Sequence, residues 1–397
     1  MLTVPDHPTH PEIRLLDGDF YAAAPHPHFR WMREHAPVYY DERAGCWGIA
    51  LHEDIMSLSK TPERFCSGGG SRPDSPPIPS MINLDDPQHK RRRNLVNKGF
   101  TPRHVEEHEP FIRDVCRQLI DNVAMRGRCD FVKEIAAPLP MIMIGEMLGV
   151  EPEDRDRLLR WSDDMISGTS ADAAPELASA AGKAFEEYAA YNRRVVADRR
   201  ANPRDDLMSV LVHAEIAGEK LSDEELLQES LLILVGGDET TRHVISGGME
   251  ALIRNPDQRQ KLIDDPAKIP GAVEEMLRWV TPIQNMSRTL TGDCELRGQK
   301  LQEGDKLLLL YVSGNRDERV FANPDVFDVE RTPNDHVAFG GFGTHFCLGA
   351  SLARLELRVM FEELMRRLPD IRLATDEKPP LRPSNFIVGI ESLPVCY

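Results

Sequence analysis

The chain is predicted to fold as a mainly α protein with a small β portion, and three observations predict this class. Helical apolar spacing dominates the sequence from Pro102 to Arg200. A second helix-compatible run continues from Asp223 to Arg254 without a proline. Strand-like alternation is confined to short segments, such as Trp47, Ile49 and Leu51 and residues 290–312.

Composition bounds the class of protein further. Of the 397 residues, 41% are hydrophobic and 28% are charged, and no composition break divides the chain, so we expect a single domain over residues 1–397. Residues 1–14 are expected to form a flexible N-terminal segment, and Met1–Pro11 is rich in proline and histidine. No apolar run is long enough for a signal peptide or a membrane span, which favours a cytoplasmic protein. A net charge of −17 argues against a nucleic-acid partner.

Cysteine usage gives the redox setting. The seven cysteines are an odd number at irregular spacings, without a C-x-x-C pair. This pattern argues against a disulfide framework and against a cysteine zinc site. We therefore expect a reducing compartment.

The first half of the chain begins with a helix and a strand pair around Ala44-Gly45, within residues 30–60. Ser67–Ser80 contains too much glycine and proline for a helix or a strand interior. A domain linker is the simplest explanation. Both flanking segments, however, are too short to close a core of their own, so we favour a mobile loop that covers a pocket. Stops at Gly127, Pro138–Pro140 and Glu151-Pro152 divide the helical region that follows.

The long helix starts at a capping box of Ser222 and Glu225 and ends before Asn255-Pro256. Two adjacent glycines, Gly236 and Gly237, stand in its middle at a cost of about 1 kcal/mol each relative to alanine. They mark either a helix crossing or a functional site. The hydroxyl of Thr240 can bond the carbonyl of Gly236, four residues earlier, and open a local gap in the helix.

Cys347 is the most informative single residue. It lies in the glycine-rich segment 339–349, F-G-G-F-G-T-H-F-C-L-G, immediately before another predicted helix. Backbone N–H groups at a helix N-terminus favour a thiolate, which lowers the cysteine pKa. A buried structural cysteine beside a glycine turn is the alternative. The loop as a whole favours a metal ligand with room for a flat macrocycle.

This segment resembles the haem-binding loop of the cytochrome P-450 family, F-x-x-G-x-H/R-x-C-x-G. Gly343, His345, Cys347 and Gly349 match it in spacing. The resemblance implies haem b as cofactor, Cys347 as the axial ligand of its iron and the family's triangular, α-rich prism fold. One departure is the glycine at position 340, where the family usually has an aromatic residue. We expect a local bulge there, with either Phe339 or Phe342 beside the thiolate.

Further motifs extend the resemblance. Gly236, Gly237, Glu239 and Thr240 match the family's A/G-G-x-D/E-T segment, in which Glu239 and Thr240 would relay protons for dioxygen cleavage. By themselves Glu275 and Arg278 read as a surface ion pair. Within the family they form, with Arg331, a buried network that supports the cysteine loop. The resemblance also assigns the haem propionates to His89, Arg93, Arg288 and His345.

Partners and substrate follow from the same resemblance. Lys90, Arg91 and Arg92 are expected to form an outward basic patch that docks a ferredoxin, which is reduced by its ferredoxin reductase. The runs at 160–164, 236–243, 274–279 and 381–386 are similar to bacterial P-450s that oxidise the terminal methyl of cholesterol or cholest-4-en-3-one. Such an enzyme requires an apolar tunnel, and the candidate wall residues are Met81, Ile82, Ile233, Leu234, Val235 and Ile387–Ile390.

Three alternatives remain open at this stage. The substrate is another steroid or a fatty acid, the enzyme is a peroxide-driven peroxygenase, or the protein is a noncatalytic haem sensor. Intact Glu239 and Thr240 count against a peroxygenase, because peroxide brings its own protons.

Overall fold

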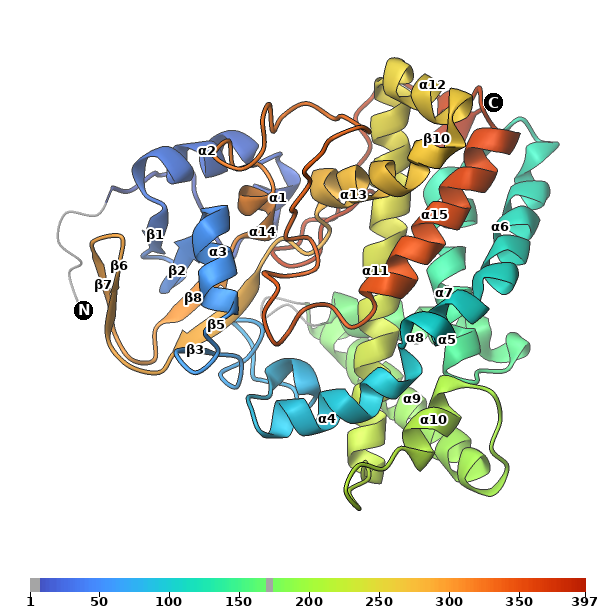
Figure 1. Ribbon diagram of the computed structural model, residues 1–397, viewed down its shortest axis with the longest axis horizontal. Coiled ribbons are helices and arrows are strands. Elements are labelled where there is room, and N and C mark those ends of the chain that lie inside the picture. The colour runs from blue at the N-terminus through green and yellow to red at the C-terminus, as the bar shows by residue number, and fades with distance from the viewer. Residues whose placement is uncertain (1–7, 169–173) are drawn as a thin grey trace.

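The computed structural model describes residues 8–168 and 174–397 (Figure 1). Most of these residues are helical, and the mainly α prediction is confirmed. The α-helices are α1 (Gly18–Ala22), α2 (His26–His35), α3 (His52–Ser59), α4 (Gln88–Val96), α5 (Pro102–Glu107), α6 (Glu109–Ala124), α7 (Pro138–Met147), α8 (Arg155–Ser167), α9 (Pro175–Ala201), α10 (Leu207–His213), α11 (Asp223–Arg254), α12 (Pro256–Asp264), α13 (Ile269–Val280), α14 (Tyr311–Gly314) and α15 (Ala350–Arg367).

Short helices of other types connect some of these elements, at Met81–Asn83, Asn97–Gly99, Val132–Ala136, Pro152–Asp154 and Pro266–Lys268. No helix within the described ranges is long and apolar enough to cross a lipid bilayer.

The strands are short and lie mostly at one side of the molecule (Figure 1). They are β1 (Val38–Asp41), β2 (Cys46–Ile49), β3 (Phe65–Cys66), β4 (Arg128–Asp130), β5 (Met286–Leu290), β6 (Cys294–Leu296), β7 (Gln299–Leu301), β8 (Lys306–Leu309), β9 (Arg372–Leu373) and β10 (Pro394–Cys396). The main sheet has the order β1-β2-β8-β5-β3. β2 and β8 pair in parallel, with Trp47 opposite Leu307, and the other pairs are antiparallel.

The long helix α11 organises the helical part of the molecule. It has the predicted bounds, and Ser222 and Glu225 form the predicted capping box. α11 packs against α7, α9, α13 and α15, so it has neighbours on all sides (Figure 1). Burial of this kind, rather than helix propensity, is what holds a helix of 32 residues with two internal glycines.

Two predictions about the first half need adjustment. A short helix, Val132–Ala136, does end before Pro138, but Pro138 and Pro140 lie in the first turn of α7. Proline is tolerated there because its missing N–H would have no helical partner. The segment Ser67–Ser80 is pinned rather than free. Its Arg72 donates to the side chains of Asn285 (2.5 Å) and Asn385 (2.7 Å).

The N-terminal segment is also held where the structure describes it. The side chain of Ile13 is buried, and the backbone of His10 exchanges hydrogen bonds with the Tyr39 hydroxyl. The remainder of the segment predicted to be flexible, residues 1–7, lies outside the described residues.

Candidate functional site

A cavity of about 240 Å³ lies between α11 and the loop that precedes α15. Apolar side chains form most of its wall, among them Met81, Ile82, Leu232, Ile233, Ile283 and Met286. Polar groups border it at several places, among them the thiol of Cys347, a cluster of histidines and arginines, the α11 segment that contains Thr240, and Glu356 of α15.

The loop at 339–349 holds Cys347 by packing on α3. The Cys347 N–H donates to the carbonyl of Phe339 at 3.0 Å. A Cβ atom at Gly341 or Gly343 would lie 2.3 Å from the hydroxyl oxygen or 1.7 Å from the carbonyl oxygen of Ser59, so both glycines are required by close approach. Gly349 differs, because a Cβ there would meet no protein atom within 4 Å. Its face of the loop is open to whatever fills the cavity.

The structure distinguishes the two phenylalanines that the sequence leaves open. Phe339 borders the cavity, and the guanidinium of Arg354 lies 4.6 Å above its ring. Phe342 is 47% exposed and stacks on Phe346, with ring centroids 5.0 Å apart. Positive φ angles at Gly340 and Phe342 form the bulge that turns Phe342 outward. Phe339 is therefore the phenylalanine beside the thiol.

The electrostatics of Cys347 differ from the prediction. Burial raises the pKa of the Cys347 thiol, whereas the Gly349 N–H and the guanidinium groups of Arg93 and Arg354 lower it, and burial outweighs them. The predicted lowering of the pKa is therefore wrong for the protein alone, because three weak favourable contacts do not replace the lost water. The side chain is nevertheless open to the cavity itself. A cation placed there would supply the missing stabilisation of the thiolate.

His89, Arg93, Arg288 and His345 come together at one edge of the cavity. The imidazole centroids of His89 and His345 are 4.1 Å apart. Burial, followed by the charges of Arg288 and other neighbours, lowers the pKa of His345 to about 2, and burial also lowers the pKa of His89. Both rings are therefore neutral.

This cluster has unused hydrogen-bonding capacity. His89 Nε2 is buried without a hydrogen-bond partner. Within the described residues, Arg93 and Arg288 form no ion pair with a carboxylate, and each donates only to a backbone carbonyl, of Phe346 and Ser287 respectively. Buried cations without counter-charges are costly, so the cluster is suited to an anionic group in the cavity.

Gly236 and Gly237 of α11 have different surroundings. A Cβ at Gly237 would lie 2.5 Å from the side chain of Ile144 in α7, so this glycine is a helix-crossing residue. At Gly236 a Cβ would meet nothing within 4 Å, although the residue borders the cavity. The Thr240 hydroxyl donates to the Gly236 carbonyl at 3.0 Å, as its spacing predicts, but α11 continues through this point without a break.

Glu239 lies behind this helix face rather than in the cavity wall. Its buried carboxylate accepts from Arg242 and from Arg382 (2.7 Å), and His243 Nε2 is 3.3 Å away. Burial raises the pKa of Glu239, but His243 and the two arginines lower it more, to about 2. The carboxylate is therefore ionised and neutralised by neighbouring cations.

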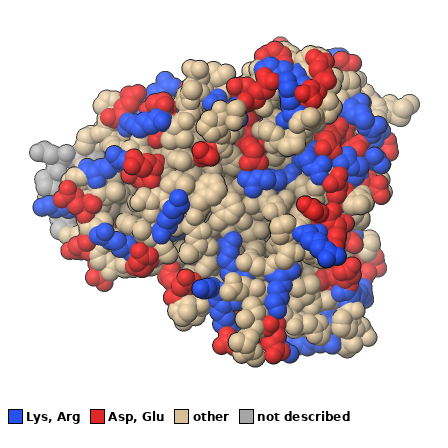
Figure 2. All heavy atoms as spheres, viewed as in Figure 1, with Lys and Arg blue, Asp and Glu red and all other residues tan. Residues whose placement is uncertain are grey.

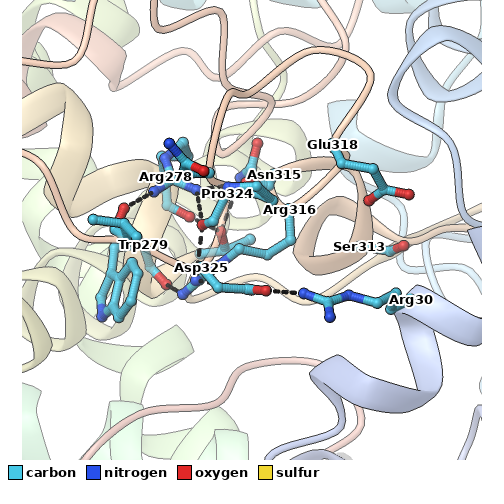
Figure 3. Close-up of polar contacts among 12 residues, drawn as sticks. Arg30, Arg278, Trp279, Ser313, Asn315, Arg316, Glu318, Pro324 and Asp325 are labelled. Carbon is cyan, nitrogen blue, oxygen red and sulfur yellow. Dashed lines mark hydrogen bonds and ion pairs between the residues drawn. The ribbon is translucent and has the colours of Figure 1, made fainter.

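Glu275, Arg278 and Arg331 form one buried network. Both carboxylate oxygens of Glu275 accept from Arg278 at 2.7 Å, and one also accepts from Arg331 at 3.0 Å. Arg278 further donates to the carbonyls of Asn315 and Pro324, beside Arg316 and Trp279 (Figure 3). The network joins α13 to the long irregular segment that leads to the cysteine loop.

Comparison with known proteins decides the family. The family model described as cytochrome P450 matches residues 68–396. The chain belongs to the cytochrome P450 family. A curated relative, a steroid C26-monooxygenase of Mycobacterium tuberculosis, is 52% identical over 389 residues, which cover 98% of this chain and 97% of the relative. A methyl-branched lipid omega-hydroxylase of Mycobacterium bovis is 41% identical, covering 89% of this chain and 84% of the relative.

Solved cytochrome P450 structures have the same fold. A Mycobacterium marinum cytochrome P450 in complex with pseudoionone aligns with a TM-score of 0.91 and 34% identity, and the alignment covers all of both chains. A Bacillus megaterium enzyme in complex with testosterone aligns with a TM-score of 0.86 and 33% identity, covering 94% of this chain and 99% of that one. The predicted fold family is confirmed.

The cofactor of cytochrome P450 is haem b, bound through a cysteine thiolate. The described residues fit it on three counts. The thiol of Cys347 borders the cavity, Gly349 leaves the loop surface open, and two unpaired guanidinium groups with the unsatisfied His89 Nε2 suit a pair of carboxylates. On this basis we propose that His89, Arg93, Arg288 and His345 would bind the haem propionates.

The predicted basic patch on this cytochrome P450 is wrong for two of its three residues. Arg91 pairs with Glu219 and Glu225, and Arg92 pairs with Glu225 and the fully buried Glu229. These acids come from α11 and the segment before it, far along the sequence, so α4 alone gives no sign of them. Lys90 is exposed as predicted.

Several polar groups at the site were missed from the sequence. Arg242, three residues after Glu239, was recognisable from its helical spacing. Arg382 had no such signal, because it reaches Glu239 from 143 residues away. Glu274 was also missed, although it accepts from Arg354 at 2.7 and 2.9 Å and lies 3.2 Å from His336 Nε2.

Proposed function

We propose that this cytochrome P450 hydroxylates the terminal methyl group of a sterol side chain, with cholesterol or cholest-4-en-3-one as substrate. The observation that carries the proposal is the 52% identity, over nearly the full length of both chains, to a steroid C26-monooxygenase. The predominantly apolar cavity beside Cys347 supports it, since a sterol tail offers no polar group to bind.

Haem b, when bound, supplies the activation of dioxygen, from which one oxygen atom enters the substrate and the other leaves as water. The chain's own residues do the rest. In the proposal, Cys347 would supply the sulfur ligand of the iron. Arg93 and Arg288 would neutralise the propionates, and the neutral imidazoles of His89 and His345 would donate hydrogen bonds to them. The Glu275 network keeps the cysteine loop in place.

Proton supply falls to Thr240 and Glu239 in this proposal. The Thr240 hydroxyl lies at the cavity wall and donates to the Gly236 carbonyl. In the proposal, the hydroxyl rotates away from this carbonyl to donate a proton into the cavity. Glu239 is ionised and held by Arg242 and Arg382, and it must exchange one of these partners to pass a proton from solvent. Glu239 therefore cannot pass a proton while both Arg242 and Arg382 are bound to its carboxylate.

Selectivity for a terminal methyl needs geometric control. A primary C–H bond is stronger than the nearby tertiary bonds of a sterol tail, so an unconstrained oxidant would attack the tertiary carbons. A narrow apolar passage that admits the tail first would present the methyl to the haem before the tertiary carbons. We propose that Ile82, Leu232, Ile233 and Ile283 form this passage.

We further propose a ferredoxin and its reductase as the source of electrons. The face that carries the cysteine loop, α4 and α15 has a largely uncharged centre, with lysine and arginine side chains interspersed with acidic ones around it (Figure 2). Phe342, exposed at the surface of the loop, provides an apolar contact there. In a chain of net charge −17, the lysine and arginine side chains on this face are the groups that an acidic partner would contact.

We also propose that the chain is a single cytoplasmic domain. The cavity draws its wall from α4, α11, β5 and α15, so the helical part and the sheet cannot form it separately.

The test is product analysis. Purified holoenzyme is incubated with cholest-4-en-3-one, NADPH and a surrogate ferredoxin and reductase, and the products are identified by mass spectrometry against authentic standards. We expect oxidation at the terminal methyl. Oxidation elsewhere on the sterol would contradict the regiochemistry.

The rival functions give different outcomes in the same assay. Oxidation of a methyl-branched fatty acid in preference to the sterol would favour the second curated relative, which is a lipid omega-hydroxylase. Product formed with hydrogen peroxide but never with ferredoxin would indicate a peroxygenase. A substrate-induced change in the haem spectrum without any product would indicate a sensor.

A further inference from the structure

A group of potential metal ligands lies outside the residues that line the haem cavity, where the proline- and histidine-rich N-terminal segment meets α2. His10, Glu12 and His28 each offer a ligand atom, and these atoms all lie within 4.8 Å of one another. The Nε2 atom of His28 is 3.8 Å from a carboxylate oxygen of Glu12. α2 packs beside β1 at the sheet side of the molecule (Figure 1).

We propose that His10, Glu12 and His28 bind a divalent transition-metal ion, of which Zn²⁺ is the best suited. Two imidazoles and one carboxylate are a usual zinc donor set, whereas Mg²⁺ and Ca²⁺ prefer oxygen ligands alone. The site leaves a fourth position for water. Nothing in the monooxygenase reaction uses these residues.

The surroundings position the two imidazoles. The Tyr39 hydroxyl accepts from the His10 N–H (3.3 Å) and donates to its carbonyl (3.2 Å), which fixes the backbone of His10. The His10 ring packs edge-on against Trp31 and His28, with centroids 5.0 and 5.2 Å away. The His28 ring in turn lies against Phe20 at 5.6 Å. These contacts restrain the backbone of His10 and the orientation of both rings.

Closing the site needs only a small movement. Tetrahedral zinc with bonds of about 2.0 to 2.1 Å has ligand atoms roughly 3.3 Å apart, somewhat closer than these atoms are now. The Glu12 side chain is 72% exposed and free of packing, so it can rotate inward. His10 Nδ1 accepts a weak bond of 3.3 Å from the Glu12 N–H. Coordination through His10 Nε2 places the ring proton on Nδ1, so the bond from the Glu12 N–H would be lost when the metal binds.

A matched surface cluster separates a built site from chance. His104, His108 and Glu107 offer the same residue types at the start of the next helical region, with the imidazoles 5.2 Å apart. His104 Nδ1 is 3.5 Å from Glu107. Within the described residues, however, these three do not bring their ligand atoms together as His10, Glu12 and His28 do. His104→Gln is therefore the control variant.

The experiment is zinc titration of untagged, chelator-treated holoenzyme by calorimetry, with zinc chloride in a buffer that does not bind metal. We expect one Zn²⁺ per chain with micromolar or tighter affinity, and a higher melting temperature when zinc is present. His28→Gln and Glu12→Gln should each weaken binding by roughly tenfold or more, and His104→Gln should leave it unchanged.

The haem absorbance spectrum of each variant shows that it is folded, so loss of zinc binding is not confused with loss of structure. Absence of saturable zinc binding by the wild type would overturn the proposal. Equal affinity in His28→Gln and the wild type would overturn it as well. Steroid turnover enters neither measurement, so this test is independent of the proposed reaction.

Discussion

At the level of single residues, the site depends on how one thiol is placed. Cys347 is fixed by its N–H bond to Phe339 and by glycines that let its loop lie directly on Ser59. Burial keeps the pKa of the Cys347 thiol above its ordinary value in the protein alone. The thiolate form of Cys347 is therefore stabilised by the bound metal rather than by the protein alone.

Cys347→Ala should remove the axial sulfur without unfolding the chain, because alanine fits the same backbone. The reduced carbon monoxide complex should lose the red-shifted absorbance band that thiolate ligation produces. Cys66→Ala, at a half-buried cysteine outside the cavity, should retain the band. An unchanged band in Cys347→Ala would show that another residue binds the iron.

Thr240→Ala should keep the haem but uncouple electron use from product. Without the hydroxyl, proton delivery fails and reducing equivalents are released as hydrogen peroxide, so we expect product per NADPH to fall roughly tenfold. Ser246→Ala is the matched control. Ser246 makes the same type of bond, to the Arg242 carbonyl at 2.9 Å, but lies outside the cavity wall. Unchanged coupling in Thr240→Ala would refute the relay.

At the level of elements, the two adjacent glycines of α11 have different roles that the sequence does not distinguish. Gly237 makes room for α7, and Gly236 leaves open space at the cavity. One glycine of the pair is therefore required by helix packing, and the other by the space at the site. Gly237 lies against Ile144, whereas Gly236 has no protein atom beside it, although the two residues are adjacent.

Alanine substitutions should therefore have opposite effects. Gly236→Ala gains helix propensity of about 1 kcal/mol without a clash, so its melting temperature should rise while sterol affinity falls. In Gly237→Ala the new methyl group should clash with Ile144, so the gain in helix propensity should be lost and the melting temperature should not rise. Adding Ile144→Val should restore part of the stability. Thermal unfolding and spectral substrate titration of the three variants provide the measurement. Equal stability of the two single variants would contradict the assignment.

At the level of the whole molecule, two neighbouring carboxylates of α13 connect distant parts. Glu275 binds Arg331 and Arg278, and Glu274 binds Arg354 of α15 and lies against His336. The cysteine loop runs between these two attachments. Its position is therefore set by α13 and α15 as well as by its own glycines.

Glu274 makes acid stability testable. Burial raises the pKa of Glu274, but His336 and Arg354 lower it more, from 4.5 to about 2. Because the folded-state pKa is the lower one, the ionised group stabilises the protein fully above pH 4.5 and loses this effect as the pH falls toward 2. The stabilisation amounts to at most about 3 kcal/mol.

Glu274→Gln should accordingly lower the urea midpoint at pH 7, and its deficit relative to the wild type should stay constant down to about pH 5.5 and shrink below it. Glu106→Gln, at an exposed carboxylate across the same surface groove, should show no deficit. A Glu274→Gln deficit that grows toward low pH would reverse the sign of the argument.

The sequence by itself determined the features that depend on local spacing. The ends of α11, its capping box, the Thr240 bond to Gly236 and the mainly α class all follow from residues within a few positions of one another. The haem loop was recognisable because its glycines and its cysteine are contiguous.

Only the tertiary structure decided which partners those residues have. Ser59 lies so close to the loop that only glycine fits at positions 341 and 343, and Ile144 lies against Gly237 but not against Gly236. Arg382 reaches Glu239 from a distant part of the chain. Arg91 and Arg92 were predicted to be free because their acids lie more than a hundred residues away. The physical reason is that helix periodicity and capping act over one or two turns, whereas burial and ion pairing depend on surfaces that meet only when the chain is folded.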